Sequence, residues 1–361
     1  MTQNSAVTAP SPIEKPIVIT MGDAAGIGPE IIAKAFLQQP ATLRNCFVAG
    51  DVQTMRRAAR AVCPGGQPVL PVAALASPED AMFTPPRCIP VLQIGAALAS
   101  VPWGAVSAVA GEFAGRCVLW AADAALHGAV RAMVTAPLHK EALRAAGAPF
   151  DRFAGHTEML QDCAARFLGQ TTTHVPVRMM LANDELRTVL VSIHLSLRDA
   201  IEAVTFDNVL QTILITHATM TDMLGRPPRI ALAGLNPHAG EGGLFGCEEL
   251  DVIIPAMQAA RMHGCLLWGP LAPDTVFMRA RTQAGKPGEF DVVIAMYHDQ
   301  GLIPVKYLGV EKGVNVTLGL PLVRTSPDHG TAFDIAGTGG ADASSLLEAV
   351  RVARALSAST S

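Results

Sequence analysis

The sequence lacks the features that define several large classes of protein. Only 16% of its 361 residues are charged, the formal net charge is −4, and no long run of lysine or arginine is present. Bulk electrostatics therefore does not favour binding to nucleic acid or to an anionic membrane surface. Half of the residues are hydrophobic, which excludes an intrinsically disordered chain. A chain of this length buries a large core and favours two domains.

Paired cysteines and targeting segments are also missing. The seven cysteines are scattered, odd in number and without a Cys-x-x-Cys pair, so we expect reduced thiols in a cytoplasmic protein. Residues 1–15 contain no apolar segment typical of a signal peptide and are interpreted as a flexible tail. The charge-free stretch 88–111 has the length of a membrane span. Its alanines, glycines and central proline favour a buried strand, a loop and a helix start, so we expect no membrane segment.

Short apolar runs alternate with alanine-rich helical stretches, which indicates an α/β protein with parallel and mixed sheets. Several runs are continuously apolar, as expected for strands covered on both faces. The expected strands are Pro16–Met21, Asn45–Gly50, Pro68–Ala73, Cys88–Leu92, Ala132–Thr135, Val175–Ala182, Thr188–Ile193, Arg229–Gly234 and Phe290–Met296. Only the polar turn 183–185 separates two of them, Val175–Ala182 and Thr188–Ile193, which predicts a hairpin.

A glycine-rich turn follows the first expected strand. Gly22, Gly26 and Gly28 form Gly-x-x-x-Gly-x-Gly, which is neither the Gly-x-Gly-x-x-Gly dinucleotide fingerprint nor a Walker A motif. The pattern leaves two interpretations open: a tight strand-to-helix turn below a cleft, or a loop that contacts a ligand directly.

Histidines follow three of the expected strands. His194, His238 and His298 come after Thr188–Ile193, Arg229–Gly234 and Phe290–Met296. Carboxyl ends of parallel strands converge where ligands bind, so these imidazoles predict an open divalent metal site, with Asp299 orienting an imidazole. The alternative is that each is a hydrogen-bonded structural residue.

The other histidines differ in their surroundings. His156 stands in a polar Gly-His-Thr-Glu sequence, His139 is left undecided, and three further histidines are interpreted as structural or exposed. These three are His174, His217 and His263.

Cationic and amide side chains recur at nine-residue intervals in the C-terminal part. Lys306, Asn315 and Arg324 lie among apolar residues and glycines. A buried charge needs a partner, which is either an anionic substrate or one of the protein's own acids, namely Asp274, Asp299 or Asp328. The following segment 328–339 is rich in small residues, which let a backbone approach a ligand closely.

Five motifs in order resemble the 4-hydroxythreonine-4-phosphate dehydrogenase family of pyridoxal phosphate biosynthesis. They are GHTEML, LNPHAGEGGLFG, GPLAPDTVF, YHDQGLIPVK and VNVTLGLPLVRTSPDHGTAFDIAGTG, and the similarity spans residues 17–342. The segment DHGTAFDIAGTG also resembles the nucleotide-binding loop of isocitrate and isopropylmalate dehydrogenases, whose two-domain fold this family shares. The glycine-rich turn departs from the family pattern because it lacks the usual proline.

The resemblance implies roles for individual residues. His194, His238 and His298 match the divalent metal ligands (Zn²⁺, or Mg²⁺, Co²⁺ or Mn²⁺). The residues that match substrate contacts are His156, Thr157, Lys306, Asn315 and Arg324. Those that match the nucleotide loop for NAD or NADP are His329, Gly330, Thr331 and Asp334. Lys306 and Asp299 are both candidates for the general base.

The resemblance also implies an isocitrate/isopropylmalate dehydrogenase-like organisation with an active-site cleft between two domains. Residues 16–150 with 305–361 form the nucleotide side, and 151–304 form the metal, substrate and dimer side. The family acts as a homodimer with its active site near the interface.

The implied reaction is oxidation of the 3-hydroxyl of 4-phosphohydroxy-L-threonine with loss of CO₂, giving 3-amino-2-oxopropyl phosphate. Relatives oxidise threonate or erythronate 4-phosphates, or dihydrodiols of aromatic carboxylates, with the same metal and anion sites. From the residues alone, a zinc hydrolase and a non-catalytic binding protein remain alternatives.

Overall fold

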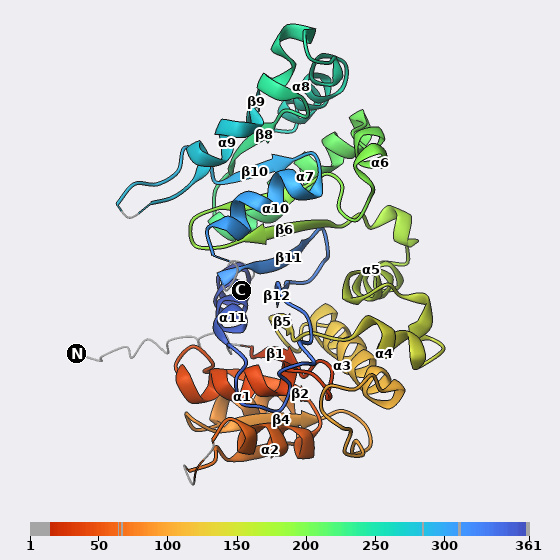
Figure 1. The fold of residues 1–361 in the computed structure, drawn as a ribbon, viewed down its shortest axis with the longest axis vertical. Helices are drawn as coiled ribbons and strands as arrows, with labels where there is room; N and C mark the ends of the chain where they lie inside the picture. Colours follow the sequence, from red (N-terminus) through yellow and green to blue (C-terminus); the bar gives the residue numbers. More distant parts are fainter. Residues whose placement is uncertain (1–14, 64, 66–67, 284, 310–311, 359–361) are drawn as a thin grey trace, which may run out of the picture.

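The computed structural model describes residues 15–63, 65, 68–283, 285–309 and 312–358. The predicted flexible tail, residues 1–15, lies outside the described residues except for Lys15. The described chain forms an elongated molecule in which the N-terminal strands lie at one end and β8 and β9 lie at the other (Figure 1).

Twelve strands of the described residues form one continuous sheet, in the order β3-β4-β2-β1-β5-β12-β11-β6-β7-β10-β8-β9. The strands are β1 (Ile17–Thr20), β2 (Cys46–Gly50), β3 (Val72–Leu75), β4 (Ile89–Gln93), β5 (Ala132–Thr135), β6 (Arg178–Ala182), β7 (Arg187–Leu190), β8 (Arg229–Ala233), β9 (Leu266–Leu271), β10 (Val292–Ala295), β11 (Val314–Leu318) and β12 (Arg324–Pro327). The predicted α/β architecture with parallel and mixed pairing is therefore confirmed.

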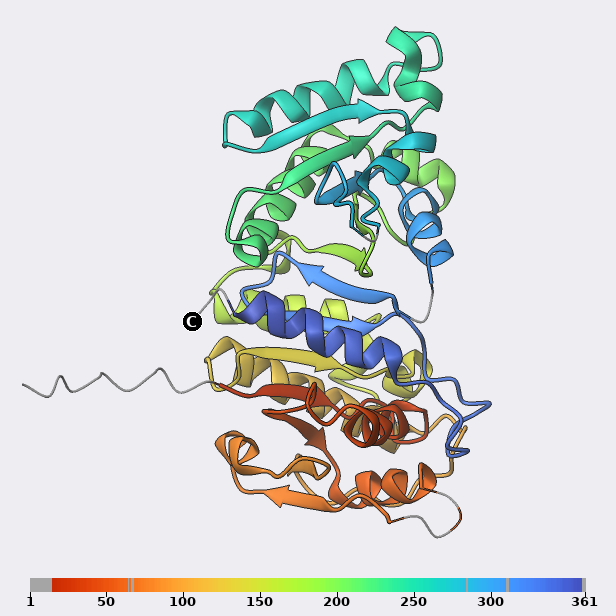
Figure 2. The same ribbon diagram turned by 90° about the vertical axis from the view of Figure 1, so that its left-hand side faces the viewer.

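Helices cover both faces of this sheet. The α-helices are α1 (Gly28–Gln38), α2 (Val52–Ala61), α3 (Ala108–Leu126), α4 (Lys140–Ala145), α5 (His156–Phe167), α6 (Leu197–Glu202), α7 (Phe206–Leu224), α8 (Ile254–Arg261), α9 (Pro273–Ala280), α10 (His298–Tyr307) and α11 (Ser344–Ser357). Short 3-10 or π turns are η1 (Pro78–Phe83), η2 (Phe150–Arg152), η3 (Thr172–His174), η4 (Pro237–Gly243) and η5 (Glu249–Ile253). Figures 1 and 2 show α11 on one side of the sheet and α3 to α5 on the other.

Six neighbouring strands, from β3 to β12, run parallel to one another. Every residue of β1, β2 and β5 is buried, because helices pack on both faces of these strands. Their side chains are accordingly apolar or small. The stretch 88–111 contains β4, a loop and the start of α3, as predicted. In the part of the chain that is described, no helix is long and apolar enough to cross a membrane.

The second half of the sheet begins with antiparallel strands. β11 pairs antiparallel with both β12 and β6, and β6 pairs antiparallel with β7. The predicted hairpin is confirmed: Asn183 Oδ1 accepts the backbone N–H groups of Glu185 and Leu186 and closes the turn. Beyond it, β7, β10, β8 and β9 are parallel. Three adjacent parallel strands thus end just before His194, His298 and His238.

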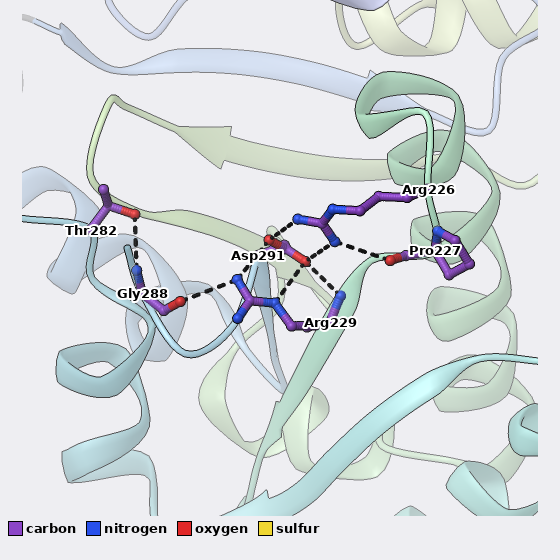
Figure 3. A network of polar contacts seen from close by, with 6 residues as sticks. All are labelled: Arg226, Pro227, Arg229, Thr282, Gly288 and Asp291. Atoms are coloured by element: carbon purple, nitrogen blue, oxygen red, sulfur yellow. Dashed lines mark hydrogen bonds and ion pairs between the residues drawn. The ribbon is translucent and has the colours of Figure 1, made fainter. Parts of the chain in front are cut away.

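Two arginines and one aspartate bind the beginnings of β8 and β10 together (Figure 3). Arg226 donates to both carboxylate oxygens of Asp291 at 2.9 Å, and the backbone N–H of Arg229 donates to Oδ2 at 2.7 Å. Burial raises the pKa of Asp291, but hydrogen bonds from Arg226 and Arg229 outweigh burial and hold this pKa well below its usual range. This network fixes the alignment of the strands that carry two of the three histidines.

Candidate functional site

The predicted metal histidines lie at the carboxyl ends of β7, β10 and β8. The rings of His194 and His298 approach each other, with centroids 6.0 Å apart. His238 is the second residue of η4. Three non-glycine residues of this turn, His238, Ala239 and Glu241, have left-handed φ values between 45° and 56°. Such strained backbone concentrates at functional sites. The strand ends thus bring His194 and His298 close together, and His238 follows the adjacent strand β8.

Two adjoining cavities contain these histidines. The larger, of about 750 Å³, includes His238, and the smaller, of about 460 Å³, includes His194 and His298. Tyr297 and Asp299 line both. Within the described ranges, no three His, Cys, Asp or Glu side chains lie close enough together to hold a metal ion. The structure thus pairs His194 with His298 and leaves His238 in the neighbouring cavity, so the metal site remains a prediction.

The chemistry of the donor set nevertheless suits a divalent metal. His298 Nδ1 lies 2.6 Å from Asp299 Oδ1, and His238 Nδ1 lies 3.0 Å from Glu241 Oε2. Metal-binding imidazoles are usually held in this way by a carboxylate on the nitrogen that does not bind the metal. The predicted orienting role of Asp299 is in keeping with this contact. Glu241 was not predicted, and its signal in the sequence is the spacing His-x-x-Glu.

Arg324 is a buried cation held by neutral groups. Its side chain is 4% exposed and donates to Thr135 Oγ1 at 2.7 Å and to Thr317 Oγ1 at 3.1 Å. Burial lowers its pKa to about 10, an effect that the charge of Glu158 partly opposes. Among the described residues, no carboxylate lies within ion-pairing distance of this guanidinium. A buried charge held only by hydroxyls is unfavourable, which indicates that an anion completes the site.

His156 lies beside this cation, at the start of α5. Burial, the charge of Arg324 and the charge of Lys140 hold the pKa of His156 well below its usual range, so the ring is neutral at pH 7. Its Nε2 atom is buried and has no hydrogen-bond partner among the described residues. A neutral imidazole N–H can donate to an anion, so His156 and Arg324 form one candidate anion pocket. Thr157 follows in the first turn of the same helix.

The remaining predicted substrate residues differ in their partners. Lys306 Nζ lies 2.8 Å from Asp328 Oδ2, so this lysine pairs with one of the protein's own acids, which the sequence left as the alternative. Asn315 lies two residues before Thr317 on β11 and therefore shares the sheet face of Arg324, which stands opposite Thr317 on β12. Asp299 lies instead beside His298.

The predicted nucleotide loop packs on the glycine-rich turn. The carbonyl of Thr331 accepts the N–H of Ile27 at 3.0 Å, and a Cβ at Gly26 would lie 2.9 Å from Thr331 Cβ. The buried carboxylate of Glu30 accepts backbone N–H groups of Gly337 and Ala341 and fixes the end of the loop. His329, Gly330 and Asp334 also lie on this loop, with Gly330 and Asp334 exposed. The glycines of the turn therefore permit contact between backbone segments.

Thr135, Asp23 and His139 were not predicted as site residues. Thr135 supports the Arg324 guanidinium, whereas Asp23 and His139 meet between the glycine-rich turn and the end of β5. The sequence signal for His139 was its position in Thr-Ala-Pro-Leu-His-Lys, directly after a strand. For Asp23 the signal was only its place between glycines.

Comparison with known proteins identifies the family. The family model of the pyridoxal phosphate biosynthetic protein PdxA matches residues 42–353. A 4-hydroxythreonine-4-phosphate dehydrogenase of Beijerinckia indica is 50% identical over 349 residues, covering 96% of this chain and 97% of the relative. A D-threonate 4-phosphate dehydrogenase of Cupriavidus necator is 46% identical over 338 residues, covering 93% of this chain and 95% of the relative.

Solved structures agree with the sequence comparison. A 4-hydroxythreonine-4-phosphate dehydrogenase of Klebsiella pneumoniae superposes with a TM-score of 0.81 at 40% identity, covering 95% of this chain and all of the other. A terephthalate 1,2-cis-dihydrodiol dehydrogenase of Burkholderia xenovorans has a TM-score of 0.64 at 30% identity, covering 94% and 97% of the two chains. The resemblance read from the five motifs is confirmed, and the chain belongs to the PdxA family of pyridoxal phosphate biosynthetic proteins.

Proposed function

We propose that the protein is a divalent-metal-dependent NAD(P) dehydrogenase. It oxidises the 3-hydroxyl of 4-phosphohydroxy-L-threonine, and the product loses CO₂ to give 3-amino-2-oxopropyl phosphate. Membership of the PdxA family and relatives of up to 50% identity support a dehydrogenase that acts on a phosphorylated hydroxy acid. The same membership favours this activity over the zinc hydrolase and over the non-catalytic binding protein. The scattered cysteines support a cytoplasmic location.

The observation that carries the proposal is the buried guanidinium of Arg324. Its described partners are the hydroxyls of Thr135 and Thr317, and its charge acts on His156, whose buried Nε2 has no hydrogen-bond partner among the described residues. A phosphate or carboxylate of the substrate supplies the missing negative charge, and Arg offers it two parallel hydrogen bonds. Thr157 and Asn315 complete the proposed substrate contacts.

His194, His238 and His298 are the residues that would hold the metal. A divalent ion bound there lowers the pKa of a substrate hydroxyl and polarises the ketone that forms, while a nicotinamide cofactor accepts the hydride. Asp299 and Glu241 orient two of the imidazoles through Nδ1. Lys306, paired with Asp328, and Asp299 are the candidates that receive the hydroxyl proton.

Exposed apolar side chains around the histidines support a homodimer. Leu195, Leu197, Ile303 and Tyr307 lie close to His194 and His298 in sequence, and each is more than half exposed. Large apolar side chains that are exposed beside a site are typical of a protein interface. We therefore propose that a second copy of the chain covers this region. The test is the molar mass in solution by light scattering, and a monomer at micromolar concentration would contradict it.

A second substrate is favoured by specific relatives. The Cupriavidus necator protein, a D-threonate 4-phosphate dehydrogenase, is 46% identical, close to the 50% of the relative from Beijerinckia indica. Threonate 4-phosphate carries the same phosphate and hydroxyl without the amino group. The structural likeness to the dihydrodiol dehydrogenase keeps an aromatic dihydrodiol as a third candidate.

A substrate panel tests the proposal. The purified protein is incubated with Zn²⁺, Mg²⁺, Co²⁺ or Mn²⁺, with NAD⁺ or NADP⁺, and with one of four substrates. These are 4-phosphohydroxy-L-threonine, D-threonate 4-phosphate, D-erythronate 4-phosphate and a terephthalate cis-dihydrodiol. Absorbance at the wavelength of reduced nicotinamide measures oxidation, and release of CO₂ measures decarboxylation. The first substrate is expected to give the highest kcat/KM; a higher value for another substrate would reassign the function within the family, and no reduction of either cofactor would refute it.

A further inference from the structure

Four buried polar atoms on the segments that form the glycine-rich turn, the predicted nucleotide loop and the strand ends next to them lack a hydrogen-bond partner among the described residues. They are Thr20 Oγ1, Asp23 Oδ2, His139 Nδ1 and His329 Nε2. Thr20 ends β1, Asp23 lies in the glycine-rich turn, His139 follows β5, and His329 lies in the loop after β12. Buried polar atoms are nearly always hydrogen-bonded in folded proteins, so a group of unpaired atoms indicates a ligand.

The carboxylate of Asp23 is held in place through one oxygen, and its other oxygen has no hydrogen-bond partner among the described residues. The residue is fully buried, and its Oδ1 accepts the N–H of Ala25 at 2.8 Å. Its own N–H donates to the carbonyl of Pro137 at 2.9 Å, which joins the glycine-rich turn to the segment after β5. His139 acts on this carboxylate through its charge and through its backbone N–H. The second oxygen, Oδ2, is therefore fixed in place as a free acceptor.

The ring of His139 is held just as firmly. It stacks on the ring of Phe333 with centroids 4.5 Å apart and planes 14° apart. Phe333 belongs to the predicted nucleotide loop, whose Thr331 packs against Gly26. The stack leaves the imidazole edge, with Nδ1, as the group able to donate or accept a hydrogen bond.

The segment 135–140 connects this pair to the anion pocket. Thr135 supports the guanidinium of Arg324, and the charge of Lys140 acts on His156. His139 stands between them in the chain. A ligand held by Asp23 and His139 therefore lies next to the substrate pocket, which is where the reacting ring of a nicotinamide cofactor must lie for hydride transfer.

We propose that Asp23 and His139 bind the carboxamide of the nicotinamide ring, an inference that rests on the proposed dehydrogenase function. Asp23 Oδ2 accepts the carboxamide N–H, and His139 Nδ1 donates to the carboxamide oxygen. The pair then positions the ring without taking part in the chemistry. Burial raises the pKa of Asp23, and a donor on Oδ2 offsets that effect by stabilising the carboxylate.

Nucleotide binding in the absence of substrate tests this assignment. The affinities of NAD⁺, or of NADP⁺ if it binds more tightly, and of the analogue with nicotinic acid in place of nicotinamide are measured by calorimetry. The wild-type protein is expected to disfavour the analogue, because its carboxylate faces Asp23. Asp23→Asn is expected to weaken the nicotinamide nucleotide about tenfold or more and to remove most of its advantage over the analogue.

Variants of His139 give a second, independent measurement. His139→Asn keeps a polar atom near the position of Nδ1 and is expected to retain more affinity for the nucleotide than His139→Leu. His217→Asn is the matched control, because His217 Nδ1 is also buried without a hydrogen-bond partner in the described part of the chain but lies on α7. This control is expected to bind as the wild type does.

The possible outcomes separate the inference from the proposed function. The carboxamide assignment would be overturned if Asp23→Asn kept the wild-type preference between nucleotide and analogue. It would also be overturned if His139→Asn and His139→Leu bound the nucleotide equally well. Either result would indicate that a buried water is the hydrogen-bond partner of these atoms. If Asp23→Asn does not fold, the His139 pair decides. Failure of the wild-type protein to bind any nicotinamide nucleotide would refute the proposed function, and the assignment with it.

Discussion

Replacement of Arg324 by methionine separates substrate binding from folding. Methionine has a similar length and no charge, so the change removes the guanidinium and leaves the surrounding packing largely filled. We expect the KM for the phosphorylated substrate to rise and the ligand-free protein to remain folded. Both expectations follow from a cation that is 4% exposed and held by hydroxyl groups.

The magnitude for binding comes from the hydrogen bonds that an anion makes to the guanidinium. A hydrogen bond to a charged group contributes about 1.5–3 kcal/mol, so loss of one such bond corresponds to a rise in KM of about 10- to 150-fold. Loss of a bidentate contact lies at or above the upper end of this range. Steady-state kinetics with varied substrate and saturating cofactor gives the value.

The magnitude for folding comes from burial of the charge. The difference between the ordinary pKa of 12.5 and the value of about 10 for Arg324 corresponds to roughly 3 kcal/mol that disfavours the charged side chain in the ligand-free protein. Methionine removes this cost but also leaves the hydroxyls of Thr135 and Thr317 without a donor. We therefore expect the free energy of unfolding to stay within about 1 kcal/mol of the wild type or to increase.

Arg178 provides the matched control. It is a half-buried arginine at the first residue of a strand, and it donates to neutral groups, Thr212 Oγ1 and Gln211 Oε1, but it is not part of the anion pocket. Arg178→Met is expected to leave KM unchanged. If Arg324→Met also leaves KM unchanged, the reasoning about an unpaired buried cation is wrong. The same holds if this change lowers the free energy of unfolding, measured by urea titration, by clearly more than about 1 kcal/mol.

Three further predictions concern the metal residues, the strand network and helix packing. His238→Ala is expected to lower the amount of bound metal, measured by mass spectrometry of the purified protein, and to abolish activity while the circular dichroism spectrum persists. His263→Ala, a change at an exposed histidine, is the control. Full activity of a metal-free His238→Ala variant would refute the assignment. Because the folded-state pKa of Asp291 lies below its ordinary value of 3.8, its ion pairs stabilise the fold above about pH 4 and are lost as pH falls toward the folded pKa. The difference in urea stability between wild type and Asp291→Asn is therefore expected to be largest at neutral pH and to shrink below about pH 4, and a constant difference would contradict this. Gly111→Ala is expected to lower the free energy of unfolding by about 1–3 kcal/mol, because a Cβ at this position of α3 would overlap the carbonyl of Ala142 on α4. Unchanged stability in calorimetry would show that α3 and α4 can move apart without cost.

Local patterns in the sequence were sufficient to predict the strands in which every residue is buried and the hairpin with a short polar turn. Ala132–Thr135 was predicted with the bounds that β5 has, and the hairpin through Asn183 was predicted from its short polar turn. Three strands were not predicted. β9 contains Gly269 and Pro270, β11 contains polar Asn315 and Thr317, and β12 reads Arg-Thr-Ser-Pro although all four residues are buried. A hydrophobic pattern does not predict strands with polar residues, because the burial of these strands depends on partners elsewhere in the chain.

By itself, the sequence determined the α/β class, the strand ends that carry the three histidines, and the family, because each is written in contiguous motifs. Only the tertiary structure decided that β10 lies between β7 and β8. It also decided that hydroxyl groups hold Arg324 and that Lys306 pairs with Asp328. The contact between Asp23 and His139 likewise depends on the tertiary structure. These contacts join residues from 22 to 189 positions apart. Hydrophobic periodicity reports which face of an element is buried, whereas the partner of a buried charge depends on which elements become neighbours when the sheet assembles.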